Sequence, residues 1–166
     1  MNINEETLIT YGIHFDEHKF KNAKQSDTRC YLNKPDFGLW CSPINSNWGW
    51  KDWCISEDFR TAKLTFGTKF KLKDDAKLLI INSYNDLLLA LKRYGTYFFE
   101  ISSNVSILNF DSMIKKGFDG MYLTEEGNRQ CHLPFGGPRW ATDLNTWDCE
   151  SLIIFKKEVM KDIELF

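Results

Sequence analysis

The segment from Phe37 to Cys54, FGLWCSPINSNWGWKDWC, constrains the fold more than any other part of this chain. Its four tryptophans alternate with Gly, Ser, Asn and Pro and do not follow the spacing of a buried helix. The apolar run at its start ends at Pro43, and Ser46 or Asn47 can then cap a helix. The segment therefore predicts a strand, a turn and a helix that continues to about Phe59.

Short strand and helix patterns follow one another in the rest of the chain, without the regular strand and helix alternation of a parallel sheet. Helices are predicted at 84–94, with Ser83 as the cap, and at 109–116, while the turn-rich segment 125–140 predicts a surface loop. No repeat or linker divides the sequence, so we expect one α+β domain over residues 1–166. Apolar runs or polar and apolar alternation predict strands at 7–15, 63–72, 76–82, 118–124 and 147–155.

Composition excludes several classes of protein. The chain has 166 residues, of which 43% are hydrophobic, enough to bury a core without disulfides or a structural metal. The formal net charge of -2 gives no overall basic excess for nucleic acid, although a local basic patch stays open. No apolar run is long enough to span a membrane, and the first twenty residues lack the pattern of a signal peptide. We therefore expect a protein made in the cytoplasm with no membrane partner.

Cysteine and histidine spacing predicts neither disulfides nor a metal site. The five cysteines are odd in number and scattered, and no CxxC or CxH pair is present. His14 and His18 are four residues apart, as on one helix face, but the surrounding GIHFDEHKF alternates like a strand. We therefore predict no bound metal.

Most familiar catalytic motifs are missing. The chain has neither the GxSxG turn of serine hydrolases nor a GxxxxGK[ST] phosphate loop. Its acidic residues could supply a carboxylate pair for glycoside hydrolysis, but their spacing does not show that any two of them face each other. A tryptophan-rich chain can also be a carbohydrate-binding module, in which indoles stack on sugars. That alternative stays open.

Three segments in a particular order suggest a different chemistry. Tyr11-Gly12 lies on the first strand, GLWCS precedes a helix that contains Trp53-Cys54, and Glu150 opens the late strand in CESLIIF. This order resembles the NAD-dependent ADP-ribosyltransferases, especially the branch of diphtheria-type toxins and poly-ADP-ribose polymerases. The resemblance implies a split β-sandwich of two packed, mainly antiparallel sheets with short flanking helices. It also implies NAD as co-substrate, no metal, and transfer of ADP-ribose with release of nicotinamide.

The resemblance assigns a role to each matching position. Trp40 and Trp53 stand where the family clamps nicotinamide between two aromatic rings, and an indole has a large stacking face. The backbone of Gly12 would approach the carboxamide, and Ser42 would add a hydroxyl contact. Glu150 would be the catalytic carboxylate, which stabilises the positive charge that develops on the ribose.

The first motif departs from the family. Where the family has histidine before glycine, this chain has Tyr11, with Thr10 before it and His14 two residues after Gly12. Tyr11, Thr10 or His14 would then contact the adenosine ribose, and alternation along a strand places Gly12 and His14 on one face. The departure leaves an alternative open, in which the protein keeps the fold but only binds a nucleotide or a protein ligand.

The acceptor of ADP-ribose is not visible in the sequence: a protein side chain, a nucleic acid base and a small molecule all fit. The segment GNRQCHLPFGGPRW predicts either a loop that recognises the acceptor, through Arg129, His132, Arg139 and Trp140, or an ordinary exposed connection. We expect a monomer. By analogy, a chain this small without accessory domains resembles a phage protein or a delivered effector, acting in the cytoplasm of the producing cell or of a host cell.

Overall fold

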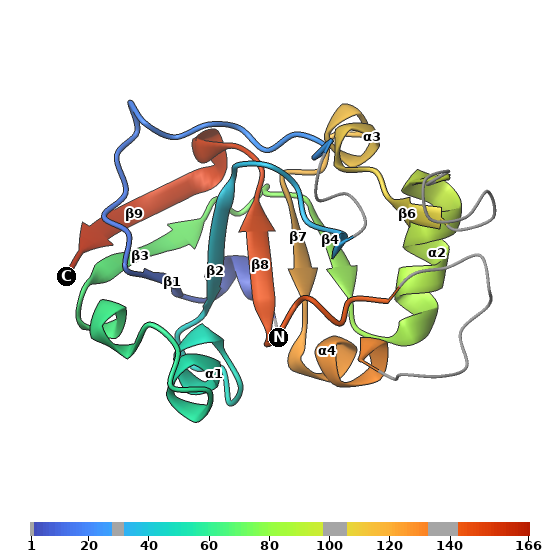
Figure 1. The fold of residues 1–166 in the computed structure, drawn as a ribbon. Coiled ribbons are helices and arrows are strands. Elements are labelled where there is room, and N and C mark those ends of the chain that lie inside the picture. Colours follow the sequence, from blue (N-terminus) through green and yellow to red (C-terminus); the bar gives the residue numbers. More distant parts are fainter. Residues whose placement is uncertain (1, 28–31, 98–105, 133–142) are drawn as a thin grey trace.

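The computed structural model describes residues 2–27, 32–97, 106–132 and 143–166 (Figure 1). Strands and helices are mixed along the chain, so the predicted α+β class is confirmed. The helices are α1 (Trp50–Ser56), α2 (Tyr84–Tyr94), α3 (Phe110–Lys115) and α4 (Glu125–Cys131), with short 3-10 turns η1 (Ile3–Glu5), η3 (Thr61–Thr65) and η4 (Lys157–Val159). The strands are β1 (Leu8–Tyr11), β2 (Leu39–Pro43), β3 (Gly67–Leu72), β4 (Leu78–Ile81), β5 (Gly95–Tyr97), β6 (Ser106–Leu108), β7 (Gly120–Leu123), β8 (Ser151–Ile154) and β9 (Met160–Leu165).

Seven strands form one mixed sheet in the order β4-β7-β8-β2-β1-β3-β9. β4 and β7 run parallel, whereas the other neighbours are antiparallel. β5 and β6 form a separate two-stranded sheet. β7 and β8 are buried along their whole length, as continuous apolar runs between neighbouring strands require.

The large sheet divides between β1 and β2. Figure 1 shows β1, β3 and β9 crossing the direction of β2, β8 and β7. The register pairs between β1 and β2 are Leu8 with Pro43 and Ile9 with Ser42, and the two strands separate beyond Ile9. Tyr11 remains paired with Gly67 of β3. The sheet therefore has two halves that part on the side of β1 where Tyr11 lies.

Two apolar clusters hold these halves and the helices together. The first lies between the helices and β4, β7 and β8, and includes Phe110, Trp147 and Phe155. The second draws on both halves of the sheet, with Leu8 and Phe70 from one half and Leu152 from the other. Because one cluster contains side chains from both halves, the sheet bends over its own face.

Local sequence patterns account for the helices. Ser83 caps α2 by accepting a hydrogen bond from the Asp86 N–H at 3.2 Å, and Asn109 caps α3 by accepting from the Ser112 N–H at 2.8 Å. Both helices were predicted and are confirmed. Helix α1 begins at Trp50 rather than after Ser46 or Asn47.

Several predicted elements are wrong in extent or type. The first strand ends at Tyr11 because Gly12 adopts φ +72°, a left-handed conformation that ends the extended run, so His14 does not share a strand face with Gly12. The strand predicted at 63–72 begins only at Gly67, after the turn η3. Strands β5, β6 and β9 were not predicted. The strand expected at 147–155 is shorter, because β8 spans 151–154.

The predicted loop at 125–140 begins instead as helix α4. Thr124 caps it by accepting a hydrogen bond from the Gly127 N–H at 3.0 Å, and two glutamates occupy its first turn. Arg129 and His132 therefore belong to a helix and its C-cap, while Arg139 and Trp140 lie outside the described residues. Within the described ranges, no helix is both long and apolar enough to cross a bilayer.

Candidate functional site

A cleft of about 500 Å³ opens where β1 and β2 separate, within the size range of small-molecule sites. A second hollow of about 410 Å³ adjoins it and shares Tyr11, Ser42 and Trp50. Strands, a helix and turns all contribute to the cleft lining. The lining includes Tyr11 and Gly12 at the end of β1, Trp40 and Ser42 of β2, Trp50 of α1, Arg60 and Lys63 around η3, and Trp147, Asp148, Cys149 and Ser151 before and within β8.

Trp40, for which the resemblance predicted a nicotinamide contact, forms an aromatic wall of the cleft. Its ring meets Trp147 edge to face at 4.6 Å between centroids, and Trp147 is 1% exposed. The Trp147 indole N–H donates to the Asn33 carbonyl at 2.9 Å, which fixes that ring. Trp40 is thus half-buried against an immobile neighbour and offers its remaining surface to the cleft.

Trp50, rather than the predicted Trp53, is the α1 tryptophan that lines the cleft. The two rings stack with centroids 5.0 Å apart and planes 23° apart, so one face of Trp53 is covered by Trp50. Phe59 contacts both rings edge to face. Residues three apart share a helix face, so the spacing of these tryptophans predicts that they touch. The residue at which the helix starts decides whether Trp50 or Trp53 lines the cleft.

Ser42 lines the cleft, but its hydroxyl is used within the fold. The Ser42 Oγ–H donates to the Glu150 carbonyl at 2.8 Å, and the same oxygen accepts from the Trp50 N–H at 3.2 Å. One side chain therefore joins β2, the residue before β8 and the start of α1. The Ser42 hydroxyl therefore fixes the positions of these three segments of the cleft lining relative to one another.

Gly12 and Tyr11 form the β1 side of the cleft. The Gly12 N–H donates to the Phe66 carbonyl at 2.8 Å, and a Cβ on Gly12 would lie 3.0 Å from the Lys63 side chain. The missing side chain thus lets Lys63 pass close to the backbone. Burial, with a smaller contribution from nearby Asp52, raises the pKa of Tyr11 above the ordinary value for tyrosine, so its hydroxyl remains a donor even in mildly alkaline solution.

His14 is exposed and does not line the cleft. Its ring packs edge to face on Phe66 at 5.2 Å, and its Nε2 lies 3.2 Å from the Phe166 carbonyl oxygen. The turn at Gly12 carries His14 away from the residues it was expected to accompany.

Glu150 is not brought together with the cleft residues. Its carboxylate accepts a short hydrogen bond from the Tyr122 hydroxyl, and both side chains are buried. Cys149 and Ser151, on either side of it, line the cleft, whereas Leu152 belongs to the cluster inside the bent sheet. Alternation along the strand thus turns the Glu150 side chain to the opposite face. Burial and the hydrogen bond from Tyr122 to Glu150 hold the pKa of Tyr122 far above its usual value.

The charged residues of the cleft were not predicted. Lys34, Arg60 and Lys63 line it, and Asp148 is the carboxylate that lines it in the part of the chain described here. These residues lie in loops and a 3-10 turn, for which hydrophobic periodicity gives no prediction. Burial raises the pKa of the Cys149 thiol to about 11, so this cleft residue stays protonated and is a poor nucleophile.

The cysteines and the other possible metal ligands form no metal site within the described residues. Cys41, Cys54, Cys131 and Cys149 are free and buried, and Cys30 lies outside the described residues. Among the described side chains, no three of His, Cys, Asp or Glu gather as a metal site.

Comparisons with family models, with curated proteins and with solved structures found no match for this chain.

Proposed function

We propose that the cleft binds NAD and that the protein is an ADP-ribosyltransferase, which releases nicotinamide and passes ADP-ribose to an acceptor. The observation that carries this proposal is that Gly12, Trp40 and Ser42 line one cleft. The resemblance assigns all three to the nicotinamide site, and they come from two strands that separate there. The division of the sheet also supports a fold of the ADP-ribosyltransferase type, which the resemblance describes as a split β-sandwich.

The aromatic and glycine residues suit the nicotinamide end of NAD. Trp40 and Trp50 both line the cleft and provide flat apolar surfaces for the ring. Because the Gly12 N–H is already bonded to Phe66, its carbonyl is the backbone group that can accept from a carboxamide N–H. The Tyr11 hydroxyl, held protonated, can donate to a ribose oxygen.

The cations suit the diphosphate of NAD. Lys34 lines the cleft from the segment before β2, and Arg60 and Lys63 line it from η3 and its N-cap. Three positive side chains around one cleft attract a dianionic group and screen its charge. A neutral sugar can accept hydrogen bonds from these cations but carries no charge for them to neutralise, so the cations favour the diphosphate over the carbohydrate-binding alternative.

Asp148 is positioned to replace Glu150 as the carboxylate of the reaction. Transfer requires that the bond between nicotinamide and ribose C1′ break, with its electron pair leaving on nicotinamide. The carboxylate of Asp148, as the acidic residue of the cleft lining, would stabilise the positive charge that develops at C1′. It would also accept the proton that the acceptor loses as its nitrogen or oxygen bonds to C1′.

A second candidate function is binding of NAD or another nucleotide without transfer. The burial of Glu150 against Tyr122 favours it, because the carboxylate that the resemblance makes catalytic faces away from the cleft. The two candidates differ in one measurable property, the release of nicotinamide.

The test combines NAD titration by calorimetry with detection of free nicotinamide by mass spectrometry, water serving as acceptor. We expect saturable binding, weakened about 5- to 100-fold in Trp40→Ala and largely kept in Trp40→Phe, because stacking on one ring is lost or retained. Thermal unfolding of each variant is the control for folding. Nicotinamide release supports the transferase, and binding without release supports the second candidate. Absence of NAD binding by the folded wild-type protein would refute the transferase and would also refute NAD as the ligand of the second candidate.

A further inference from the structure

Phe37 is an exposed aromatic residue held in an unfavourable backbone conformation. Its φ of 63° lies in the left-handed region, which bulky residues rarely adopt, and its side chain is 45% exposed. The backbone around it is pinned, since the Gly38 N–H donates to the Lys21 carbonyl at 3.0 Å and Lys24 pairs with Asp36 through two backbone hydrogen bonds. The loop thus fixes an apolar ring toward solvent.

Two lysines surround this ring. The Lys21 Nζ lies 5.0 Å and the Lys24 Nζ 5.8 Å from the Phe37 ring centroid, and both lysines are exposed. Each distance is within the range of a cation–π contact. A partly exposed aromatic ring with two ammonium groups over it combines a stacking surface with positive charge, which matches a ligand that alternates flat rings with negative charges.

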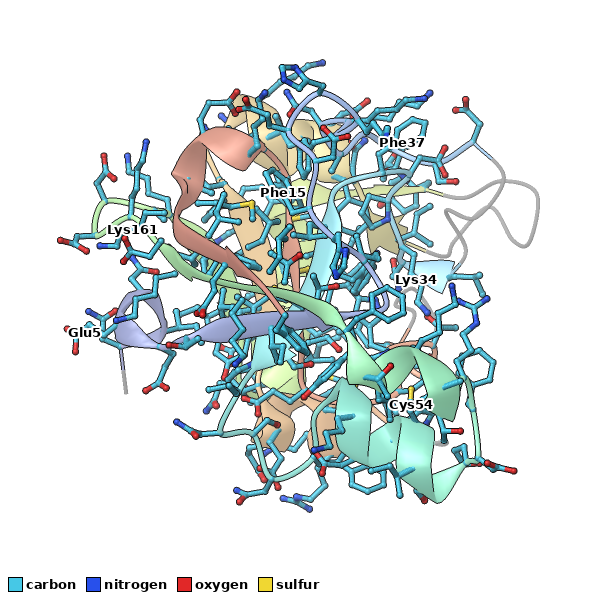
Figure 2. The ribbon with its side chains drawn as sticks, turned by 90° about the vertical axis from the view of Figure 1, so that its left-hand side faces the viewer. Glu5, Phe15, Lys34, Phe37, Cys54 and Lys161 are labelled. Carbon is cyan, nitrogen blue, oxygen red and sulfur yellow. The ribbon has the colours of Figure 1, made fainter. Side chains whose placement is uncertain are left out.

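This surface is continuous with the cleft. Lys34 lines the cleft with its Nζ 5.8 Å from the Trp40 ring, and Gly38, next to Phe37, also lines it. Phe37 and Trp40 are three positions apart in the sequence, so their Cα atoms are at most about 11 Å apart. Figure 2 shows Lys34 and Phe37 on the same side of the molecule.

We propose that Phe37, Lys21, Lys24 and Lys34, here called the Phe37 surface, bind single-stranded nucleic acid and lead one nucleotide into the cleft as the acceptor of ADP-ribose. A base would stack on Phe37 while the lysines meet the neighbouring phosphates. Docking rests on this surface alone, whereas the acceptor role rests on the proposed transfer.

Single-stranded nucleic acid fits better than the other polyanions. Duplex bases are already stacked on each other and cannot lie on Phe37 without being unpaired. An acidic peptide would use the lysines but has no flat rings that require the exposed phenyl face. The net charge of -2 for the whole chain gives no overall basic excess for nucleic acid, so binding would depend on a local basic surface. Asp36 lies in the same loop as Phe37, Asp111 accepts from the Gln25 N–H next to Lys24, and Asp148 lines the cleft.

The acceptor chemistry is the same as that given for the transfer. A nitrogen or oxygen of the entering nucleotide bonds to ribose C1′ and loses its proton, while nicotinamide leaves with the electron pair of the broken bond. The product is a strand that carries ADP-ribose, heavier by that group than the starting strand.

The test measures fluorescence anisotropy of labelled dT12 and of labelled U12, without NAD, with a 12-bp duplex and a poly-glutamate peptide as comparisons. We expect one or both single strands to bind, and the duplex and peptide at least tenfold more weakly. Binding of dT12 alone identifies DNA, and binding of U12 alone identifies RNA. No binding of either strand, or equal binding of the peptide, overturns the proposal.

Variants locate the binding on the Phe37 surface. Phe37→Leu removes the aromatic face and should weaken strand binding about 5- to 100-fold, whereas Phe37→Tyr should retain it. Lys21→Gln with Lys24→Gln should reduce the slope of log affinity against log salt by about 1.4, because two phosphate contacts are lost. Leu89→Ala and Lys92→Gln on α2 make comparable changes at exposed positions and should have no effect. Loss of affinity in the α2 variants equal to that at Phe37 overturns the proposal.

Parallel NAD titration separates this inference from the proposed function. Strand binding without NAD binding keeps the docking surface and refutes the transferase. NAD binding and nicotinamide release without strand binding keep the transferase and refute the nucleic acid acceptor. When both bind, mass analysis of the strand after incubation with NAD shows whether it gains ADP-ribose, and an unmodified strand refutes the acceptor role.

Discussion

The side chains at residues 149–151 lie on two faces with different surroundings. Cys149 and Ser151 line a cleft with cations and tryptophans, whereas Glu150 between them faces a closed interior and bonds to Tyr122. All three residues are buried, yet two of them contribute to the cleft lining and the third stabilises the bent sheet. A shift of one residue along a strand exchanges the two faces, so the position of a carboxylate in a short motif does not establish which face it serves.

The largest expected difference between the faces is in turnover. Asp148→Asn should lower the rate of nicotinamide release about 100-fold, the usual loss when one preorganised charge is removed from a transition state. Glu150→Gln should leave the rate within a factor of about three, because its side chain does not reach the cleft. Steady-state rates with folded, NAD-saturated protein decide between them. The opposite pattern would show that Glu150 turns into the cleft during the reaction.

The next effect is on stability and belongs to the closed face. Glu150→Ala leaves the buried Tyr122 hydroxyl without its acceptor and should lower the free energy of unfolding by about 2 kcal/mol. Glu158→Ala, at an exposed position, is the matched control and should change it by less than about 0.5 kcal/mol. Urea denaturation measures both. NAD affinity should be unchanged in the folded Glu150 variant, and a tenfold loss would place this residue in the ligand site.

A smaller effect separates the stacked tryptophans of α1. Trp50→Ala should weaken NAD binding by about 1–2 kcal/mol through lost stacking, and Trp50→Phe should recover most of it. Trp53→Ala should instead lower the melting temperature, since this ring packs on Trp50 and Phe59. Calorimetric titration and thermal unfolding of the three variants test the distinction. A greater loss of NAD affinity in Trp53→Ala than in Trp50→Ala would restore Trp53 as the clamp.

The smallest effect is a pH dependence of the closed face. The pKa of Tyr122 is raised in the folded protein, so its contribution is complete below pH 10, the unfolded value, and is lost as pH rises beyond it. Between pH 9 and pH 11 the wild type should lose about 1 kcal/mol more stability than Tyr122→Phe. Urea denaturation at both pH values measures this difference. Equal losses would mean that Tyr122 ionises as easily folded as unfolded.

Sequence patterns predicted the parts of the fold that local interactions determine. Ser83 and Asn109 cap their helices as expected, and FDGMYLT contains the buried strand β7. Gly12, Trp40 and Ser42, which the resemblance assigned to one site, line the same cleft, and their contact with nicotinamide stays a prediction. The choice of Trp50 over Trp53 and the direction of Glu150 depend on helix phase and strand register, which long-range packing decides. The cations of the cleft come from loops without periodicity, so no pattern marked them.

The pairing of β2 with β8 has a consequence for how the protein is made. Leu39 pairs with Ile154 and Cys41 with Leu152, so neighbouring strands of the cleft wall are separated by more than a hundred residues of chain. Such non-local pairing slows folding, because a long loop must close before its contacts stabilise the product. On the ribosome, β2 emerges early and must wait, with an exposed edge, until β8 is synthesised. The cleft between β1 and β2 is therefore completed late in translation, and the nascent chain has no such cleft before that point.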